Sequence, residues 1–144
     1  MVDPLLAAMR FDNSSAILLA ALLSLGCGSA LGADIYVIVG ANVKLSAEDV
    51  RDLYLGDKEF SGDVRLVPVD NQAAFSEFVA KALGMNPQRY NTLWVKKAFR
   101  DALNPPAVKA GDLDVLEFVK RTRGAVGYVS SVPRDKEISV VGKF

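Results

Sequence analysis

The amino-acid sequence predicts an α/β domain, built on a mixed, mostly parallel sheet with helices packed against it. Three observations support this fold class. Apolar stretches typical of strands occur at 34–40, 65–69, 125–129 and 138–141. Helical patterns separate most of these stretches, so the crossover connections are expected to be right-handed. The length of 144 residues indicates a single domain.

The first 33 residues differ from the rest and are interpreted as a cleavable signal peptide. Residues 13–33 carry no charge, and their most apolar part, 16–25, is followed by small residues. The length of this run is also compatible with a membrane span, but the short apolar part and the small-residue exit favour a secretory signal. Cleavage would begin the mature chain near Asp34, and initiation at Met9 would give a more ordinary amino-terminal region. The expected location is periplasmic or secreted, with no stable membrane span after cleavage.

Composition limits the chemistry of the mature chain. The single cysteine, Cys27, lies within the predicted signal peptide, and Ser24 stands where a lipoprotein signal has leucine, so lipidation is not expected. The sequence has no histidine, which removes the commonest general base and metal ligand. Seventeen basic residues balance 17 acidic ones, and this does not favour nucleic-acid binding. We expect no enzyme activity, no cofactor and no metal site.

The first predicted strand, 34–40, is rich in β-branched residues and ends in glycine. Ser46 follows as a candidate helix N-cap, and Asp49 stands three residues later in place of the usual glutamate of a capping box. The helix is predicted to end near Gly56, and 57–63 is predicted to be a turn.

The second predicted strand, 65–69, contains Pro68. Because proline cannot donate to the hydrogen-bond ladder, this residue favours an edge position or a strand end. A helical pattern then begins at Ala73 and closes at Gly84.

Two further helices and two strands complete the prediction. Asn86 and Pro87 predict the start of a helix that reaches about Phe99. The side chains of this helix expected to face inward are Tyr90, Leu93, Trp94 and Ala98. After a proline-rich break at 104–106, Asp112 is predicted to cap the next helix, ahead of the two final strands.

Four stretches carry a resemblance to a known family. They are SAEDVRDLYLG at 46–56, RLVPVDNQ at 65–72, LWVKKAFRDALNPP at 93–106 and RGAVGYV at 123–129. In this order, behind a signal peptide, they resemble the small exported relatives of phosphate ABC-transporter substrate-binding proteins, of the periplasmic-binding-protein-like class. The resemblance implies a type II binding-protein fold, here a single lobe formed by residues 34–144.

The resemblance also implies a function. It implies recognition of phosphate or a related small oxyanion outside the cytoplasm, in association with an ABC permease. Full-length relatives have two lobes and a Ser-Gly-Thr run ahead of a helix, whereas this chain has the length of one lobe and no such run after either of its first two strands. A second interpretation is therefore kept, in which the chain is an interaction or regulatory module of the cell envelope that has kept the fold and lost the ligand site.

Asp70, Asn71 and Gln72 follow the second strand and are the main candidates for ligand binding. Free N–H groups at the start of the next helix can bind an anion, and the side chains of Asn71, Gln72 and Arg65 would add donors. Asp70 would accept the hydrogen of a protonated oxyanion and so select against sulfate. The alternative is that Asp70 or Asn71 is an N-cap, which we prefer for Asp70 because caps are far commoner than binding sites.

Ser46 and Tyr128 complete the set of candidate ligand-binding residues. Ser46 begins a helix after the first strand, where an anion could be held, but a simple cap is the preferred interpretation. Tyr128 could present its hydroxyl to a ligand. We prefer the alternative that Tyr128 covers the core, while Gly124 and Gly127 allow close backbone approach or positive φ. The lone Trp94 is interpreted as a core anchor.

Overall fold

A five-stranded sheet is the centre of the structure, a computed structural model that describes residues 32–144. All but the last two residues of the predicted signal peptide lie outside this range, as do Met9 and Cys27. Within the described range, no helix combines the length and the apolar character needed to cross a bilayer.

The sheet is mixed and mostly parallel, as predicted. Its strands are β1 (Tyr36–Gly40), β4 (Val67–Asn71), β5 (Ala107–Lys109), β6 (Ala125–Val129) and β7 (Ile138–Lys143), in the spatial order β5-β4-β6-β1-β7. β4 pairs in parallel with β5 and β6, whereas β1 pairs antiparallel with β6 and β7. In this sheet β1 is therefore antiparallel to the other four strands.

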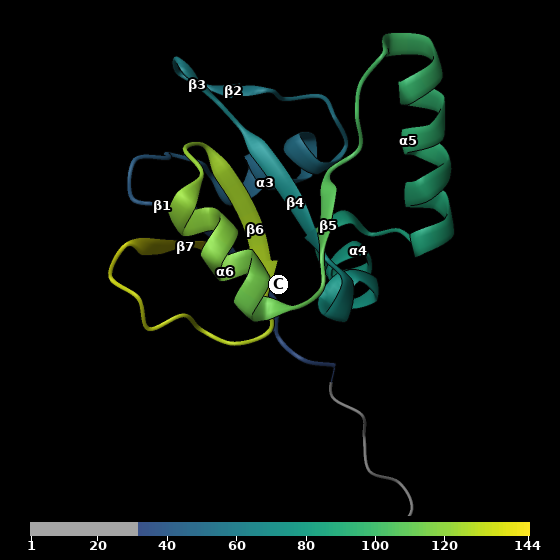
Figure 1. Ribbon diagram of the computed structural model, residues 1–144. Helices are drawn as coiled ribbons and strands as arrows, with labels where there is room; N and C mark the ends of the chain where they lie inside the picture. The colour runs from purple at the N-terminus through teal and green to yellow at the C-terminus, as the bar shows by residue number, and fades with distance from the viewer. Residues whose placement is uncertain (1–31) are drawn as a thin grey trace, which may run out of the picture. The chain divides into compact units, whose positions relative to one another are not determined.

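Helices cover both faces of the sheet (Figure 1). The remaining elements are α3 (Ala47–Tyr54), β2 (Phe60–Ser61), β3 (Val64–Arg65), the 3-10 turn η3 (Gln72–Ala74), α4 (Phe75–Leu83), α5 (Pro87–Asp101) and α6 (Asp112–Arg121). α6 packs on one face, and α3 and α4 pack on the other. α5 stands at the side of the domain, next to α4.

β6 shows how this layering follows from the sequence. Ala125 and Val129 face α6, whereas Val126 and Tyr128 point to the opposite face, where the ring of Tyr128 stacks on Phe78 with centroids 3.8 Å apart. All five residues of the strand are buried, because side chains of a strand alternate between two faces and both faces are covered. Burial of each large apolar side chain contributes roughly 1.5–3 kcal/mol.

Two glycines of the RGAVGYV stretch allow close packing. Gly124 has φ +80°, and a Cβ atom there would lie 2.0 Å from the backbone oxygen of Arg65. Gly127 lies under α6, and a Cβ atom there would lie 2.4 Å from Cγ1 of Val115. Gly124 therefore confirms both the predicted positive φ and the predicted close backbone approach, and Gly127 makes room for α6.

The predicted helix ends agree with the structure at three places. Ser46 forms a capping box with Asp49, with backbone-to-side-chain distances of 3.1 and 3.2 Å. Asn86 accepts a hydrogen bond from the backbone N–H of Arg89 at 2.8 Å, ahead of the first-turn proline of α5. Gly84 ends α4 in the left-handed conformation, with φ 64°.

The second strand differs from its prediction. Arg65 belongs to the β2–β3 hairpin, and β4 continues through Asp70 and Asn71. Pro68 pairs with β6, and the pairing with β5 starts only at Val69. Of the two placements predicted from Pro68, the strand end is correct and the edge position is wrong, because β4 lies between two neighbours.

Three other local predictions are wrong. The predicted turn 57–63 contains the strand β2. In addition, β5 was not predicted, because it is short and is specified only by its pairing with β4. The N-cap of α6 is Gly111, and Asp112 is the first helical residue. Ala98 is exposed, whereas Trp94 is buried as expected and donates from its indole N–H to the backbone oxygen of Tyr54 at 3.1 Å.

Candidate functional site at the carboxyl edge of the sheet

Polar side chains gather where β4, β5 and β6 end. The chain leaves β4 toward β5 on one side, and α6 then returns it across β4 to β6 on the other side. Open α/β sheets bind ligands outside the carboxyl ends of their strands at such a switch point. Asn71, Asp112 and Ser130 lie there, and we call these three residues the carboxyl edge.

Asp70 precedes the carboxyl edge and points into the domain. Its carboxylate accepts a hydrogen bond from the hydroxyl of Tyr90 at 2.9 Å and another from the hydroxyl of Tyr128 at 3.0 Å. The residue is only 4% exposed. The preferred N-cap interpretation of Asp70 is therefore wrong, because its carboxylate contacts two tyrosines and no helix amide.

The surroundings of Asp70 change its acidity. Burial raises the pKa of its carboxyl to about 6, although the hydrogen bonds from Tyr90 and Tyr128 act in the opposite direction. Burial, together with the nearby Asp70, also raises the pKa of both tyrosine hydroxyls, so both stay protonated as donors. A carboxylate in this position repels a fully ionised anion.

Asn71 points to the opposite side and is fully buried. Its side-chain oxygen accepts from the backbone N–H of Ala73 at 3.1 Å, so the cap interpretation is confirmed for Asn71, at the start of η3. Its side-chain nitrogen donates to the backbone oxygen of Tyr128 at 3.0 Å and to Asp112 at 2.7 Å. Asn71 thus joins β4, β6 and α6.

Asp112 accepts hydrogen bonds from the donors of the carboxyl edge. Besides Asn71, it accepts from the Ser130 hydroxyl at 2.8 Å and from the Ser130 backbone N–H at 3.1 Å. The N-cap of α6 is a glycine that provides no side-chain acceptor for the amides of the first turn. A negatively charged group at the start of a helix is stabilised by the helix dipole as well as by these donors.

A cavity of about 330 Å³ adjoins Asp70 on the side of α5. It is lined by Asp70, Tyr90, Asn91, Trp94, Val95, Ala98, Pro105, Pro106 and Val108. Apart from Asp70 and Asn91 its lining is apolar or aromatic and contains no basic residue, which does not suit a phosphate-like ligand. Within 32–144 no cluster of acidic residues could hold a metal ion, and every buried side-chain nitrogen and oxygen has a hydrogen-bond partner.

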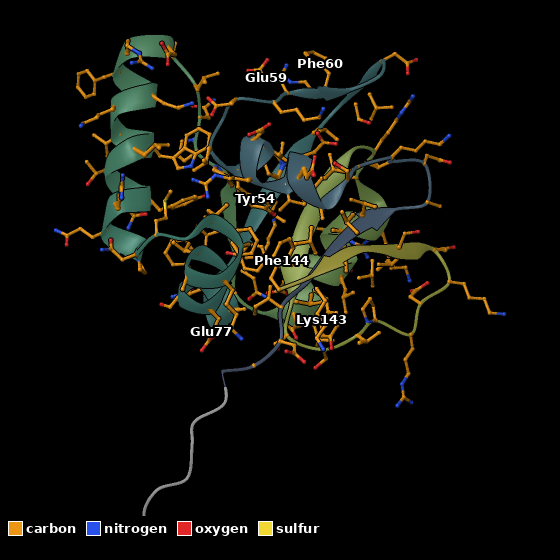
Figure 2. The ribbon with its side chains drawn as sticks, turned by 180° about the vertical axis from the view of Figure 1, so that it is seen from behind. Tyr54, Glu59, Phe60, Glu77, Lys143 and Phe144 are labelled. Carbon is orange, nitrogen blue, oxygen red and sulfur yellow. The ribbon has the colours of Figure 1, made fainter. Side chains whose placement is uncertain are left out.

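The structure does not bring all the sequence-predicted site residues together. Ser46 follows β1, and the end of β1 pairs with the beginning of β6. The backbone oxygen of the nearby Lys44 accepts a hydrogen bond from the side chain of Ser61 in the β2–β3 hairpin. Arg65 is exposed in the same hairpin, opposite Phe60. Figure 2 shows Phe60 at the end of the domain away from Glu77 of α4. Ser46 and Arg65 therefore lie at the amino end of β4, away from the carboxyl edge.

The other predicted residues lie at or near the carboxyl end of β4. Gln72 is exposed in η3, next to Asn71. Tyr128 is fully buried and its hydroxyl donates to Asp70, which confirms the packing interpretation and places the hydroxyl inside the core.

Sequence reasoning missed three residues with a part in these contacts. Tyr90 was predicted to face the core, but its hydrogen bond to Asp70 was not predicted. Asp112 was expected only as a cap, and Ser130 was not considered. Their partners lie 20, 41 and 18 residues away, and no local pattern marks such pairs.

Comparison with known proteins supports the fold. No protein-family model matches the chain, and no curated protein sequence matches it. The structure is similar to an X-ray crystal structure described as a phosphate ABC transporter substrate-binding protein with bound phosphate, from Clostridium perfringens, with a TM-score of 0.54 and 21% sequence identity. The match covers 76% of this chain and 45% of that protein, so the chain spans less than half its length. The fold is that of one periplasmic-binding-protein-like lobe.

Proposed function

We propose that the chain is an exported, single-lobe binding protein that holds phosphate or a related small oxyanion at the carboxyl edge, in association with ABC-type phosphate transport. One observation carries this proposal. Donors from Asn71 and Ser130 converge on a single carboxylate, that of Asp112, beside the first turn of α6. The same donors, together with the free amides of that turn, suit a tetrahedral oxyanion.

In this proposal Asp112 takes the role that the sequence assigned to Asp70. Its carboxylate is partly exposed and lies among the donors, so it can accept the hydrogen of a protonated oxyanion. Sulfate carries no such hydrogen at neutral pH and would face an uncompensated negative charge. The site would therefore prefer hydrogen phosphate or hydrogen arsenate to sulfate.

A second candidate function follows from the same contact. Asp112 already satisfies the donors of Asn71 and Ser130 without any ligand. This arrangement favours an interaction or regulatory module of the cell envelope, in which the former anion site has become a structural link between β4, β6 and α6. The two functions differ in whether a free oxyanion competes for these donors.

Calorimetric titration of the purified chain with phosphate, arsenate and sulfate distinguishes the two. We expect heat of binding with phosphate and arsenate and a much weaker signal with sulfate. Absence of binding of all three at millimolar concentration would leave only the interaction module.

Two variants test whether any binding occurs at the carboxyl edge. Ser130→Ala removes one donor and is expected to weaken phosphate binding by roughly tenfold, since a hydrogen bond to a charged group contributes about 1.5–3 kcal/mol. Ser131→Ala, the same change at the exposed neighbouring residue, is the matched control and should leave the affinity unchanged. Asp112→Asn removes the negative charge that excludes sulfate, so this variant should bind sulfate. Equal loss in both serine variants, or no change in selectivity with Asp112→Asn, would place the binding elsewhere.

Export is a separate part of the proposal. It predicts that the protein recovered from the cell envelope or medium begins near Asp34, as measured by its mass and amino-terminal sequence. Recovery of the intact chain would favour anchoring by the uncleaved apolar segment 16–25.

A further inference from the structure

The outer face of α5 carries two large apolar side chains that are exposed in the described part of the chain. Tyr90 and Trp94 point inward and are 3% and 6% exposed, whereas Phe99 is 92% exposed and Val95 is 60% exposed. Val95 and Phe99 are four residues apart, so they lie on the same face of the helix. Figure 1 shows α5 at the outside of the domain, so its exposed face is the convex surface of a single helix.

The same helix is strongly basic. α5 contains four basic side chains and one acidic one, Asp101, although the whole chain has no net charge. Arg89, Lys96 and Arg100 form one flank beside the apolar pair, since they follow the spacing of three or four residues on one side of a helix.

The basic flank is neutralised only in part within the described structure, where the neighbouring Lys97 pairs with Asp57 at 2.7 Å. Arg100 pairs with the adjacent Asp101, but among residues 32–144 neither Arg89 nor Lys96 has an ion pair within 4 Å. A shallow cavity of about 310 Å³ on this flank is lined by Arg89, Thr92, Leu93, Lys96, Lys97 and Arg100. Its lining therefore contains four cations, of which Lys97 and Arg100 are paired with the aspartates Asp57 and Asp101 outside the lining.

We propose that the outer face of α5 docks the chain peripherally onto an anionic lipid surface. Val95 and Phe99 would enter the boundary between headgroups and acyl chains, while Arg89, Lys96 and Arg100 contact lipid phosphates. This combination of apolar residues and a basic flank is typical of helices that lie in a membrane interface. The proposal does not depend on oxyanion binding, because α5 is a different element from those that carry the carboxyl edge.

The shape of the surface favours lipid over an acidic protein. A protein partner would need a pocket that fits a convex helix, whereas a lipid interface adapts to protruding side chains. Long basic side chains can keep their charged ends at the phosphates while their stems lie on apolar material. The attraction is expected to weaken as salt is added, because exposed charges are screened.

A fluorescent probe on α5 tests the proposal in the full-length chain. In Phe99→Trp the new indole is highly exposed, and the only other tryptophan, Trp94, is buried and gives a constant background. We expect its emission to shift to the blue with vesicles of phosphatidylcholine and phosphatidylglycerol in equal parts, and much less with phosphatidylcholine alone. The matched control is Phe60→Trp, at a 51% exposed aromatic residue on the hairpin, for which no shift is expected.

Charge variants complete the test. In the Phe99→Trp background, reversal of Arg89 and Lys96 to glutamate should lower the affinity for anionic vesicles by tenfold or more, since each basic residue near such a surface contributes on the order of a fivefold factor. Reversal of two exposed basic residues elsewhere, Lys44 and Lys136, is the control for net charge. No shift at position 99, an equal shift with both kinds of vesicle, or an equal loss in both reversals would overturn the proposal.

Discussion

Asp70 and Asn71 are adjacent in sequence, but they belong to two different regions of the molecule. Asp70 is enclosed between the hydroxyls of Tyr90 and Tyr128, on the face covered by α3 and α4. Asn71 reaches the other side of β4, where it meets Asp112 of α6. The alternation of a strand separates the two side chains, although the sequence presents them as one polar group.

The two regions differ in how accessible they are to a ligand. The hydroxyl–carboxylate cluster around Asp70 is closed and contributes to the fold, and it makes the local environment negative. The carboxyl edge is partly open, and its donors meet at Asp112, which competes with any bound anion. Both regions depend on β6, because this strand contains Tyr128 and leads into Ser130.

The largest expected effect comes from displacing β6. Gly124→Ala would place a Cβ atom 2.0 Å from the backbone oxygen of Arg65 and would strain a residue with φ +80°. We expect a loss of unfolding free energy of about 3 kcal/mol or more, measured by urea denaturation. Gly62→Ala is the matched control, since its φ is +61° but no atom lies within 4 Å of the added carbon. An equal loss in both variants would show that β6 tolerates displacement.

The cluster around Asp70 provides the next largest effect. Asp70→Ala removes the acceptor of two buried hydroxyls, each of which then lacks a partner, and is expected to cost about 3 kcal/mol at about pH 5. Asp112→Ala should cost only about 1 kcal/mol, because the exposed Ser130 can bind water instead and the buried amide of Asn71 keeps its hydrogen bond to the backbone oxygen of Tyr128. A larger loss for Asp112→Ala would mean that the carboxyl edge, and not the buried cluster, holds the strands together.

The contribution of the buried Asp70 cluster to the unfolding free energy is also expected to depend on pH. The pKa of Asp70 is about 6 in the folded protein and about 4 when unfolded. Between these values the folded state binds more protons, so raising the pH from about 4 to about 6 should lower the unfolding free energy by roughly 2–3 kcal/mol. Above this window the contribution is constant.

Asp70→Asn removes this pH dependence while keeping the size of the side chain. The difference in unfolding free energy between the natural chain and Asp70→Asn, measured across the window, isolates the contribution of Asp70 from that of other carboxyls. A difference that does not change with pH would contradict the raised pKa.

The sequence predicted the features that depend on contacts between residues close together in the chain. Ser46, Gly84 and Asn86 end or begin helices through contacts within a few residues, and their caps are confirmed. Short apolar runs and glycine positions were sufficient for β1 and β6, and the ordered stretches indicated the correct fold class.

What the sequence did not predict depends on residues far apart in the chain. Asp70 was interpreted as a cap because its partner Tyr128 lies 58 residues away. β5 has only three residues, two of them exposed and one half-buried, so only its pairing with β4 makes it a strand. The convergence of Asn71 and Ser130 on Asp112 likewise requires the folded sheet.

The smallest expected effect concerns Ser46, at the opposite end of the sheet from the carboxyl edge. Ser46→Ala breaks the capping box of α3 and should cost about 1 kcal/mol of unfolding free energy in urea denaturation. Because Ser46 lies at the amino end of β4 and the carboxyl edge at its other end, the variant should bind phosphate in calorimetric titration like the natural chain. A weaker affinity in a variant that remains folded would move the anion site to the start of α3, and the carboxyl edge would then be a structural link only.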